Sequence, residues 1–271
     1  MKFSLKRKRI FWVIGWAICC AAVAGTMLWA SMNETAGCCN NELTRVPVAQ
    51  VVAPLNASTR SEEEKRVFLT FDDGPSPTTE VILDELKEKG VPATFFVIAA
   101  DNNIEYLSTI KRATEEGHQI ALHSASHDYK QIYSSTAAYW ADLKDLREKI
   151  SPYVDANSIH WIRFPGGSTN TVSHKYGGSG IMKSLKAQAT EKGYHYVDWN
   201  VCANDAIGGH PSAKTIYENV INEAQGKNTC VVLMHDTKAT KTTAQALPDI
   251  IDWFAENGYR FCKIDELDKQ I

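Results

Sequence analysis

The feature that most constrains the fold of this 271-residue chain is an alternation of short apolar runs and amphipathic segments from residue 66 onward. Short apolar runs rich in β-branched and aromatic residues are typical of buried strands. Seven such runs predict strands over residues 67–71, 93–98, 118–122, 159–164, 194–198, 229–234 and 259–263. Helices are predicted between them, near residues 77–89, 103–116, 135–150, 179–192, 212–225 and 242–257.

Glycines mark the ends of most of these helical segments, as residues that cap a helix at its C-terminus do. They are Gly90, Gly117, Gly193, Gly226 and Gly258. Strands that alternate with helices predict a parallel sheet. We therefore predict an α/β fold, a distorted (β/α) barrel of about seven units, one unit short of eight. A doubly wound open sheet is the alternative.

The N-terminal segment has the pattern of a membrane anchor. Residues 10–30 carry no charged side chain, and their length is close to the roughly 20 residues that span a bilayer. Five basic residues lie within residues 1–9, which predicts that this end stays in the cytoplasm and that the chain after residue 30 lies outside. A cleaved signal peptide is the alternative, although its apolar region is usually shorter, about 7–15 residues.

The remainder of the chain divides into a linker and a folded body. Residues 31–65 are rich in Ser, Asn, Thr and Pro without a sustained period, which predicts a linker before a domain over residues 66–271. Five of the 29 basic residues lie before residue 10, so the rest of the chain carries 24 basic and 32 acidic residues. This acidic balance argues against nucleic acid as a partner.

Cysteines give no clear disulfide framework. Cys202, Cys230 and Cys262 are scattered through the predicted domain, and no CxxC pair occurs in the chain. A structural zinc site of the CxxC type is therefore not expected. Outside the cytoplasm one disulfide among these three is possible, and free buried cysteines are the alternative.

Two adjacent carboxylates, Asp72 and Asp73, end the first predicted strand, directly before Gly74 and Pro75. Side chains of consecutive strand residues point to opposite faces, so one carboxylate could bind a metal while the other faces a substrate. Charges at the end of an apolar strand are costly to desolvate unless another group compensates them. A plain Asp-Gly-Pro turn is the alternative interpretation.

Two histidines follow the third predicted strand. His123 and His127 are spaced i, i+4, which would put both imidazoles on one face of a helical turn. Together with Asp73 they offer two nitrogens and one carboxylate oxygen, the ligand set of a catalytic zinc site with open positions. Non-haem iron uses such ligands too, and an incidental HxxxH pattern is the alternative. The remaining histidines except His235 fit no such pattern and are expected to be structural or exposed.

Further polar residues follow the later strands, where a barrel has its catalytic rim. Arg163 could orient one of the two carboxylates, and Gly166 could let a backbone N–H face a developing oxyanion. His235 ends an apolar run and is a candidate general acid, with Asp198 as the group that keeps it protonated. Asp236 could be the partner instead, or could cap the next turn.

Five ordered motifs resemble those of polysaccharide deacetylases, carbohydrate esterase family 4. They are TFDDGP at 70–75, HSASH at 123–127, RFPGG at 163–167, DW at 198–199 and LMH at 233–235. The resemblance covers about residues 66–265, the NodB-homology domain. It implies a distorted (β/α) barrel, a divalent metal, usually zinc with cobalt, manganese, nickel and iron as alternatives, and removal of acetyl groups from N-acetylated sugars.

The resemblance also implies roles for individual residues. The implied metal ligands are Asp73, His123 and His127. The implied proton-transfer groups are Asp72 as general base, positioned by Arg163, and His235 as general acid, tuned by Asp198. The implied acetyl pocket is formed by Trp199 and Leu233. Many relatives carry an aromatic residue where this chain has Gly166, so we expect a more open substrate surface here.

An anchored extracytoplasmic domain of this kind resembles a bacterial cell-wall enzyme that acts on N-acetylglucosamine in peptidoglycan. We therefore predict a polysaccharide substrate and a location at the bacterial cell membrane. Three alternatives remain: deacetylation of chitooligosaccharide or another exopolysaccharide, hydrolysis of O-acetyl groups such as those of xylan, and glycan binding without catalysis.

Overall fold

A computed structural model describes residues 64–208 and 210–268. Within these ranges eight strands form one sheet, and every strand pair in it is parallel. The strands are β1 (Arg66–Asp72), β2 (Thr94–Ile98), β3 (Gln119–Ser124), β4 (Trp161–Ile162), β5 (His195–Tyr196), β6 (Val201–Cys202), β7 (Thr229–His235) and β8 (Arg260–Cys262). The predicted α/β class with a parallel sheet is confirmed.

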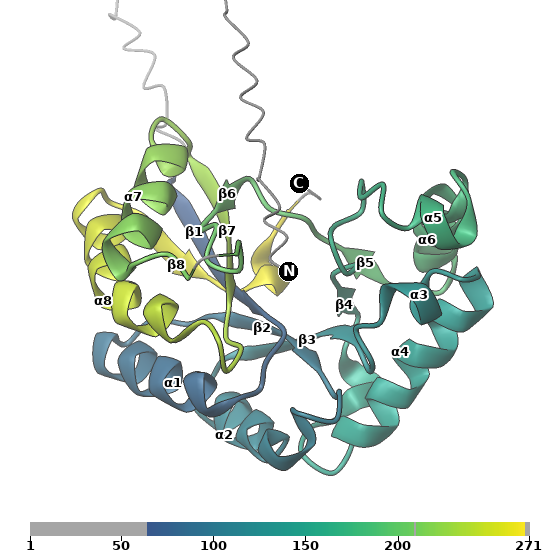
Figure 1. The fold of residues 1–271 in the computed structure, drawn as a ribbon. Helices are drawn as coiled ribbons and strands as arrows, with labels where there is room; N and C mark the ends of the chain where they lie inside the picture. The colour runs from purple at the N-terminus through teal and green to yellow at the C-terminus, as the bar shows by residue number, and fades with distance from the viewer. Residues whose placement is uncertain (1–63, 209, 269–271) are drawn as a thin grey trace, which may run out of the picture. The chain divides into compact units, whose positions relative to one another are not determined.

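The strand order is β5-β4-β3-β2-β1-β7-β6, with β8 paired to the first half of β1. β5 and β6 are therefore the two ends of the sheet, and no ladder joins them in the described part of the chain. The sheet curls with helices outside it (Figure 1), as in a (β/α) barrel that is open between β5 and β6. The barrel expectation is thus met by an incomplete barrel.

Helices cover the outer side of this sheet (Figure 1). The α-helices are α1 (Pro77–Lys89), α2 (Thr109–Glu115), α3 (Tyr129–Ile132), α4 (Thr136–Ile150), α5 (His174–Gly177), α6 (Ile181–Glu191), α7 (Ala213–Ala224) and α8 (Lys241–Glu256). The described part of the chain also has three 3₁₀ turns, η1 (Ile104–Tyr106), η2 (Ala156–Ser158) and η3 (Ile264–Glu266). Neighbouring helices contact one another, α1 with α8, α8 with α7, and α4 with α6.

The start of α1 shows how the sequence sets an element that carries the site. Ser76 caps the helix by accepting from the Thr78 N–H, and the Thr79 hydroxyl accepts in return from the Ser76 N–H. Pro77 occupies the first turn, where a missing N–H costs nothing. Gly90 ends the helix at a φ of 66°, a left-handed conformation that favours glycine. Helix 77–89 is therefore where the sequence predicts it.

β1 alternates between two environments. Val67, Leu69 and Phe71 are fully buried in the core between the sheet and the helices, where Phe71 stacks on Phe95 with 5.2 Å between ring centroids. Phe68 belongs instead to the cluster on the concave face of the sheet. Because side chains alternate along a strand, Asp72 has the same orientation as Phe68, two pleats closer to the C-terminal end. The concave face thus changes from apolar to polar along β1.

Several elements differ from the sequence-based expectation. The predicted helix 103–116 is divided into η1 and α2, because the backbone hydrogen bonds between them span three residues instead of four, although Leu107 and Ser108 keep right-handed helical dihedrals. Only two residues of each of the predicted strands 159–164 and 194–198 form a strand, as β4 and β5. β6 was not predicted, since two residues cannot display a period. The helices α3 and α5 are single turns of four residues and also carried no signal.

The predicted segments 1–9 and 10–30, and nearly all of the linker 31–65, lie outside the described residues. Among the helices that the structure describes, none combines the length and the apolar character that crossing a bilayer requires. Cys202, Cys230 and Cys262 are free thiols, two of them buried, so the alternative without a disulfide among these three holds.

Candidate metal and catalytic site

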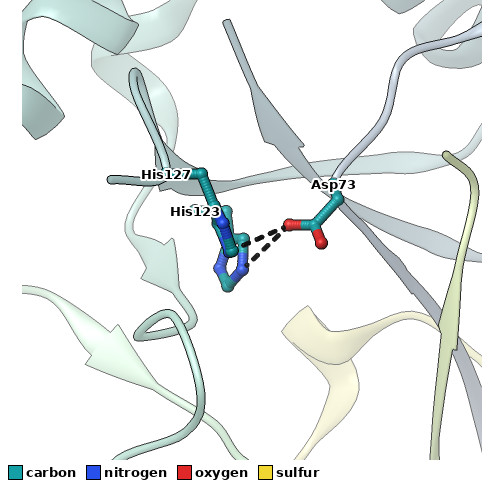
Figure 2. A group of neighbouring side chains, drawn as sticks. All are labelled: Asp73, His123 and His127. Atoms are coloured by element: carbon teal, nitrogen blue, oxygen red, sulfur yellow. Dashed lines mark ion pairs between the residues drawn. The ribbon is translucent and has the colours of Figure 1, made fainter. Parts of the chain in front are cut away.

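Three side chains converge at the C-terminal end of β1 and β3 (Figure 2). The Oδ1 atom of Asp73 lies 3.4 Å from Nε2 of His123 and 3.2 Å from Nε2 of His127. One ligand atom from each residue lies within 4.8 Å of the others, a spacing that could hold a metal ion. The Asp73 Oδ1 atom is buried and has no hydrogen-bond partner within residues 64–208 and 210–268. A buried carboxylate oxygen without a donor is consistent with a cation ligand.

The protonation of His123 suits this role. Its Nδ1 atom lies 2.6 Å from the carbonyl oxygen of Arg163, which can only accept, so Nδ1 carries the hydrogen. Nε2 then keeps its lone pair in the neutral ring and faces Asp73. Burial lowers the pKa of His123, which favours that neutral ring.

The local structure of the histidine pair differs from the predicted helical turn. His123 lies in β3, one residue before its end, and His127 lies beyond the strand at a φ of 53°. The His127 N–H donates to the Ser124 hydroxyl. The carboxylate of Asp142, in α4, accepts from the backbone N–H groups of Ala125 and Ser126 and from the Ser124 hydroxyl. This loop, not a helix, brings the two rings together, with 5.2 Å between centroids.

Asp73 also has a left-handed backbone, with a φ of 70°, which is uncommon for a residue other than glycine. The side-chain amide of Asn103 donates to the carbonyl oxygens of Asp73 and Pro75, each at 3.0 Å. Asn103 is 2% exposed, so these bonds form in a desolvated place. Neither Asn103 nor Asp142 belongs to a motif, and sequence reasoning did not single them out.

Asp72 and Arg163 form a buried ion pair beside the metal group. The Arg163 side chain is fully buried, and its Nη1 lies 2.8 Å from Asp72 Oδ1. Three further guanidinium hydrogens donate to the Thr70 hydroxyl and to the carbonyl oxygens of Val197 and Asp198. A buried charge pair is stable only when further hydrogen bonds satisfy it, and here four of the five guanidinium hydrogens are bonded. The expected contact between Arg163 and a carboxylate is present.

The partner of His235 is Asp205, not Asp198. His235 Nδ1 lies 2.8 Å from Asp205 Oδ1, and the His235 N–H donates to Asp205 Oδ2 at 2.7 Å. Burial alone lowers the pKa of His235, but the hydrogen bond and charge of Asp205 outweigh it and raise that pKa to about 9. The ring is therefore a cation at neutral pH, as a general acid requires.

Strand pairing explains why the prediction of Asp198 was wrong. β5 pairs with β4, so Asp198 faces the loop after β4 and accepts from the N–H and hydroxyl of Ser168. β6 pairs with β7, with Cys202 beside Leu233, so the chain three residues after Cys202 reaches the end of β7. Asp205 lies there. The sequence showed Asn204-Asp205 at this point but did not indicate which carboxylate would meet His235.

Asp236 is a second buried carboxylate, and it does not contact His235 through its side chain. The hydroxyl of Thr79 donates to its Oδ2 at 2.6 Å, and the Ser76 hydroxyl donates to its backbone carbonyl oxygen. With no cation beside it, burial raises the pKa of Asp236 to about 7. Asp236 therefore joins the end of β7 to the start of α1.

The residues expected to surround the acetyl group also lie at the C-terminal ends of the strands. Gly166 and Gly167 have φ values of 77° and 85°, and a Cβ on Gly167 would lie 3.2 Å from the Trp199 ring. The Arg163 guanidinium carbon lies 5.7 Å from the centre of that ring. Leu233 is buried in β7, two residues before His235. Beside the metal group a cavity of about 290 Å³ is lined by residues that include Asp73, Asn102, His127 and Lys238.

Comparison with known proteins shows the family of this chain. Residues 59–180 match the sequence model of the polysaccharide deacetylase family. A peptidoglycan-N-acetylglucosamine deacetylase of Bacillus cereus is 31% identical over 96% of this chain and 93% of its own length. The chain therefore belongs to the polysaccharide deacetylase family, carbohydrate esterase family 4, and is a hydrolase.

Solved structures are similar as well. The catalytic domain of peptidoglycan N-acetylglucosamine deacetylase from Eubacterium rectale is 40% identical, with a TM-score of 0.70 over 78% of this chain and 93% of that one. A polysaccharide deacetylase from Bacillus cereus is 30% identical, with a TM-score of 0.65 over 76% of this chain and 95% of that one. The incomplete barrel is thus the fold of this family.

Proposed function

We propose that this protein removes N-acetyl groups from N-acetylglucosamine residues of peptidoglycan, releasing acetate and leaving a free amine. The observation that carries the proposal is the 31% identity to a peptidoglycan-N-acetylglucosamine deacetylase over almost the full length of both chains. The similar structure from Eubacterium rectale, which is the catalytic domain of a peptidoglycan N-acetylglucosamine deacetylase, supports it.

The proposal includes a divalent ion held by Asp73, His123 and His127. Two imidazoles and one carboxylate leave open positions for water and substrate, and this donor set suits zinc best, with cobalt, manganese, nickel and iron as alternatives. When bound, such an ion lowers the pKa of water and polarises a carbonyl oxygen. The unpartnered Asp73 Oδ1 atom supports this assignment.

We propose Asp72 as the general base and His235 as the general acid. Asp72 Oδ2 lies 3.8 Å from His123 Nε2, so a water molecule beside the metal group would be within its reach. Arg163 holds the Asp72 carboxylate through Oδ1, which leaves Oδ2 to take a proton from the attacking water. His235, kept cationic by Asp205, gives its proton to the amine nitrogen as the C–N bond breaks.

The acetyl group would lie between the proposed base Asp72 and the proposed acid His235. We propose that the Gly166 N–H donates to the carbonyl oxygen as negative charge develops on it. Trp199 and Leu233 would contact the acetyl methyl group. Asp198, which braces Ser168 in the loop after Gly167, would keep that loop in place without touching substrate.

The test is an acetate-release assay with metal-supplemented protein on peptidoglycan, chitooligosaccharide and acetylated xylan, with Asp72→Asn as the inactive control. Release from peptidoglycan at the highest kcat/KM is expected. Release from chitooligosaccharide or from xylan alone would replace the proposed substrate with one of those polymers. Glycan binding without release from any of them would indicate a binding module.

We also propose that residues 10–30 anchor the protein in the bacterial cell membrane with the catalytic domain outside. The basic residues before this segment and its uncharged length support the proposal. Mass spectrometry of the protein recovered from the membrane fraction tests it. An intact N-terminus is expected, whereas a secreted protein that begins after residue 30 would indicate signal cleavage.

A further inference from the structure

Tyr129, the first residue of α3, lies against both the metal group and the loop after β4. Its ring packs edge-on against His127, with 5.5 Å between centroids and 79° between planes. On its other side it contacts Tyr133 in the same manner, at 5.6 Å. The ring is therefore fixed beside a proposed metal ligand, although the residue is only half-buried.

The Tyr129 ring also lies close to Gly166 in the loop after β4. A Cβ on Gly166 would lie 2.7 Å from the Tyr129 hydroxyl oxygen and 3.3 Å from its Cε1 atom. The phenol thus occupies the space that a side chain at position 166 would take. The sequence predicted an open surface here, because many relatives carry an aromatic residue at this position. An aromatic ring from a different segment lies at this place, so the absence of a side chain at position 166 does not leave the space empty, and the openness of the whole substrate surface stays a prediction.

The hydroxyl of Tyr129 is also free to bind a ligand. The neighbouring Tyr133 hydroxyl donates to the Pro165 carbonyl oxygen at 2.7 Å and so holds the glycine loop. The Tyr129 hydroxyl forms no hydrogen bond with any residue in the described ranges. A fixed donor without a partner beside a catalytic group is a candidate for substrate contact.

We propose that the Tyr129 hydroxyl donates a hydrogen bond to the carbonyl oxygen of the scissile acetamido group, next to the Gly166 N–H. The inference depends on the proposed deacetylase function. Negative charge grows on that oxygen as water adds to the carbonyl carbon, so a phenol held at this place stabilises the transition state more than the bound substrate. The phenol keeps its proton throughout. Tyr129 is thus a catalytic residue that no motif identifies.

The decisive variant is Tyr129→Phe, which keeps the ring and removes only the hydroxyl. Loss of one oxyanion donor lowers kcat about 100-fold in comparable sites, and a fall of about 10–100-fold with little change in KM is expected. Metal content should stay at the wild-type level. Tyr217→Phe is the matched control, because this half-buried tyrosine lies in α7, outside the site, and its loss should leave kcat within twofold.

A second measurement tests the placement of the hydroxyl without any assay of activity. Gly166→Ala should destabilise the wild-type protein more than it destabilises Tyr129→Phe, because the nearest atom to the new methyl group is the hydroxyl oxygen. Thermal unfolding of the two single variants and the double variant gives this difference as a double-mutant cycle. Equal penalties in the two backgrounds would show that the hydroxyl does not occupy this space.

The outcomes separate the inference from the function on which it rests. If wild-type protein releases acetate but Tyr129→Phe keeps its kcat within twofold, the inference falls and the deacetylase function stands. A raised KM with an unchanged kcat would put the hydroxyl on another part of the sugar and would also overturn it. If wild-type protein releases no acetate from any glycan, the proposed function fails, and the catalytic role of Tyr129 fails with it.

Discussion

The two ends of the curved sheet carry histidines in very different settings. At the C-terminal end, two histidines meet one carboxylate beside a cavity of about 290 Å³. At the other end, where β3, β4 and β5 begin, a larger cavity of about 620 Å³ is lined by residues that include His118, His160 and His195. Of the described residues only the first set forms a group that could hold a metal ion.

The difference shows that neither cavity size nor the number of histidines defines a site. The His195 ring lies tilted against Trp161 with 5.0 Å between centroids, and His118 and Phe95 form an edge-to-face pair, so both histidine rings take part in packing. At the C-terminal end, by contrast, Asp72, Asp73 and Arg163 place charge in a buried environment, which is costly unless the charges serve one another or a ligand. The concentration of compensated charge is what identifies the functional end.

The largest expected effect comes from replacing a histidine at each end. His123→Ala removes one of the three proposed metal ligands, and metal affinity should fall by more than about 100-fold, with acetate release falling alongside. His195→Ala should change neither. Metal titration calorimetry and the acetate assay measure both variants. Loss of metal from His195→Ala, or its retention in His123→Ala, would break the distinction between the two ends.

A second prediction concerns the carboxylate that serves His235. The pKa of His235 is raised to about 9, so the ring is protonated below that pH, and activity should decline as pH rises through it. Asp205→Asn removes the charge that raises this pKa, so the alkaline limb of the pH–kcat profile should move down by about 1–3 pH units. At pH 8 kcat should therefore fall about twofold for a shift of 1 unit and about 90-fold for a shift of 3 units, since kcat follows the protonated fraction of His235.

Asp198→Asn provides the comparison for this second prediction. It should leave the alkaline limb in place, because Asp198 bonds Ser168 and not His235. If the alkaline limb moved in Asp198→Asn and not in Asp205→Asn, Asp198 would be the partner of His235, as the sequence suggested.

A third prediction concerns the support of Asp73. Asn103→Leu removes both hydrogen bonds that hold the carbonyl oxygens of Asp73 and Pro75, so the carboxylate loses its fixed position. Metal affinity should fall about tenfold or somewhat more, as for other residues that orient a metal ligand. Asn102→Leu is the control, since the neighbouring Asn102 is exposed and bonds neither carbonyl. Equal metal affinities of Asn103→Leu and Asn102→Leu would show that Asn103 does not hold Asp73 in place for the metal.

The smallest effect is expected at His118, at the end of the sheet where β3, β4 and β5 begin. Burial lowers the pKa of His118 in the folded protein, so the folded state binds fewer protons than the unfolded chain. The free energy of unfolding should therefore keep its full value above the ordinary histidine pKa and should decrease as pH falls below it. His118→Gln should weaken this dependence without changing kcat. Melting temperatures at pH 8 and pH 5 measure it, and an unchanged pH dependence would contradict the prediction.

Much of the candidate site could be predicted from local sequence. The carboxylates Asp72 and Asp73 end a strand, the predicted helix at 77–89 is present, and the spacing of His123 and His127 marked the pair of histidines that meets Asp73. The prediction was weaker where the local structure depends on contacts with distant parts of the chain. The helical turn proposed for the histidine pair is in fact a strand end followed by a left-handed residue, held by Asp142 from a distant helix.

The sequence alone determined the alternation of strands and helices, the ends of the helices and the candidate ligands at strand ends. These features depend on interactions between residues close together in the chain, such as side-chain period and capping. Only the tertiary structure decided that Asp205 meets His235, that Asn103 holds the Asp73 loop and that Tyr129 occupies the space above Gly166. These contacts depend on which strands pair and where the sheet stays open, and distant segments of the chain set both.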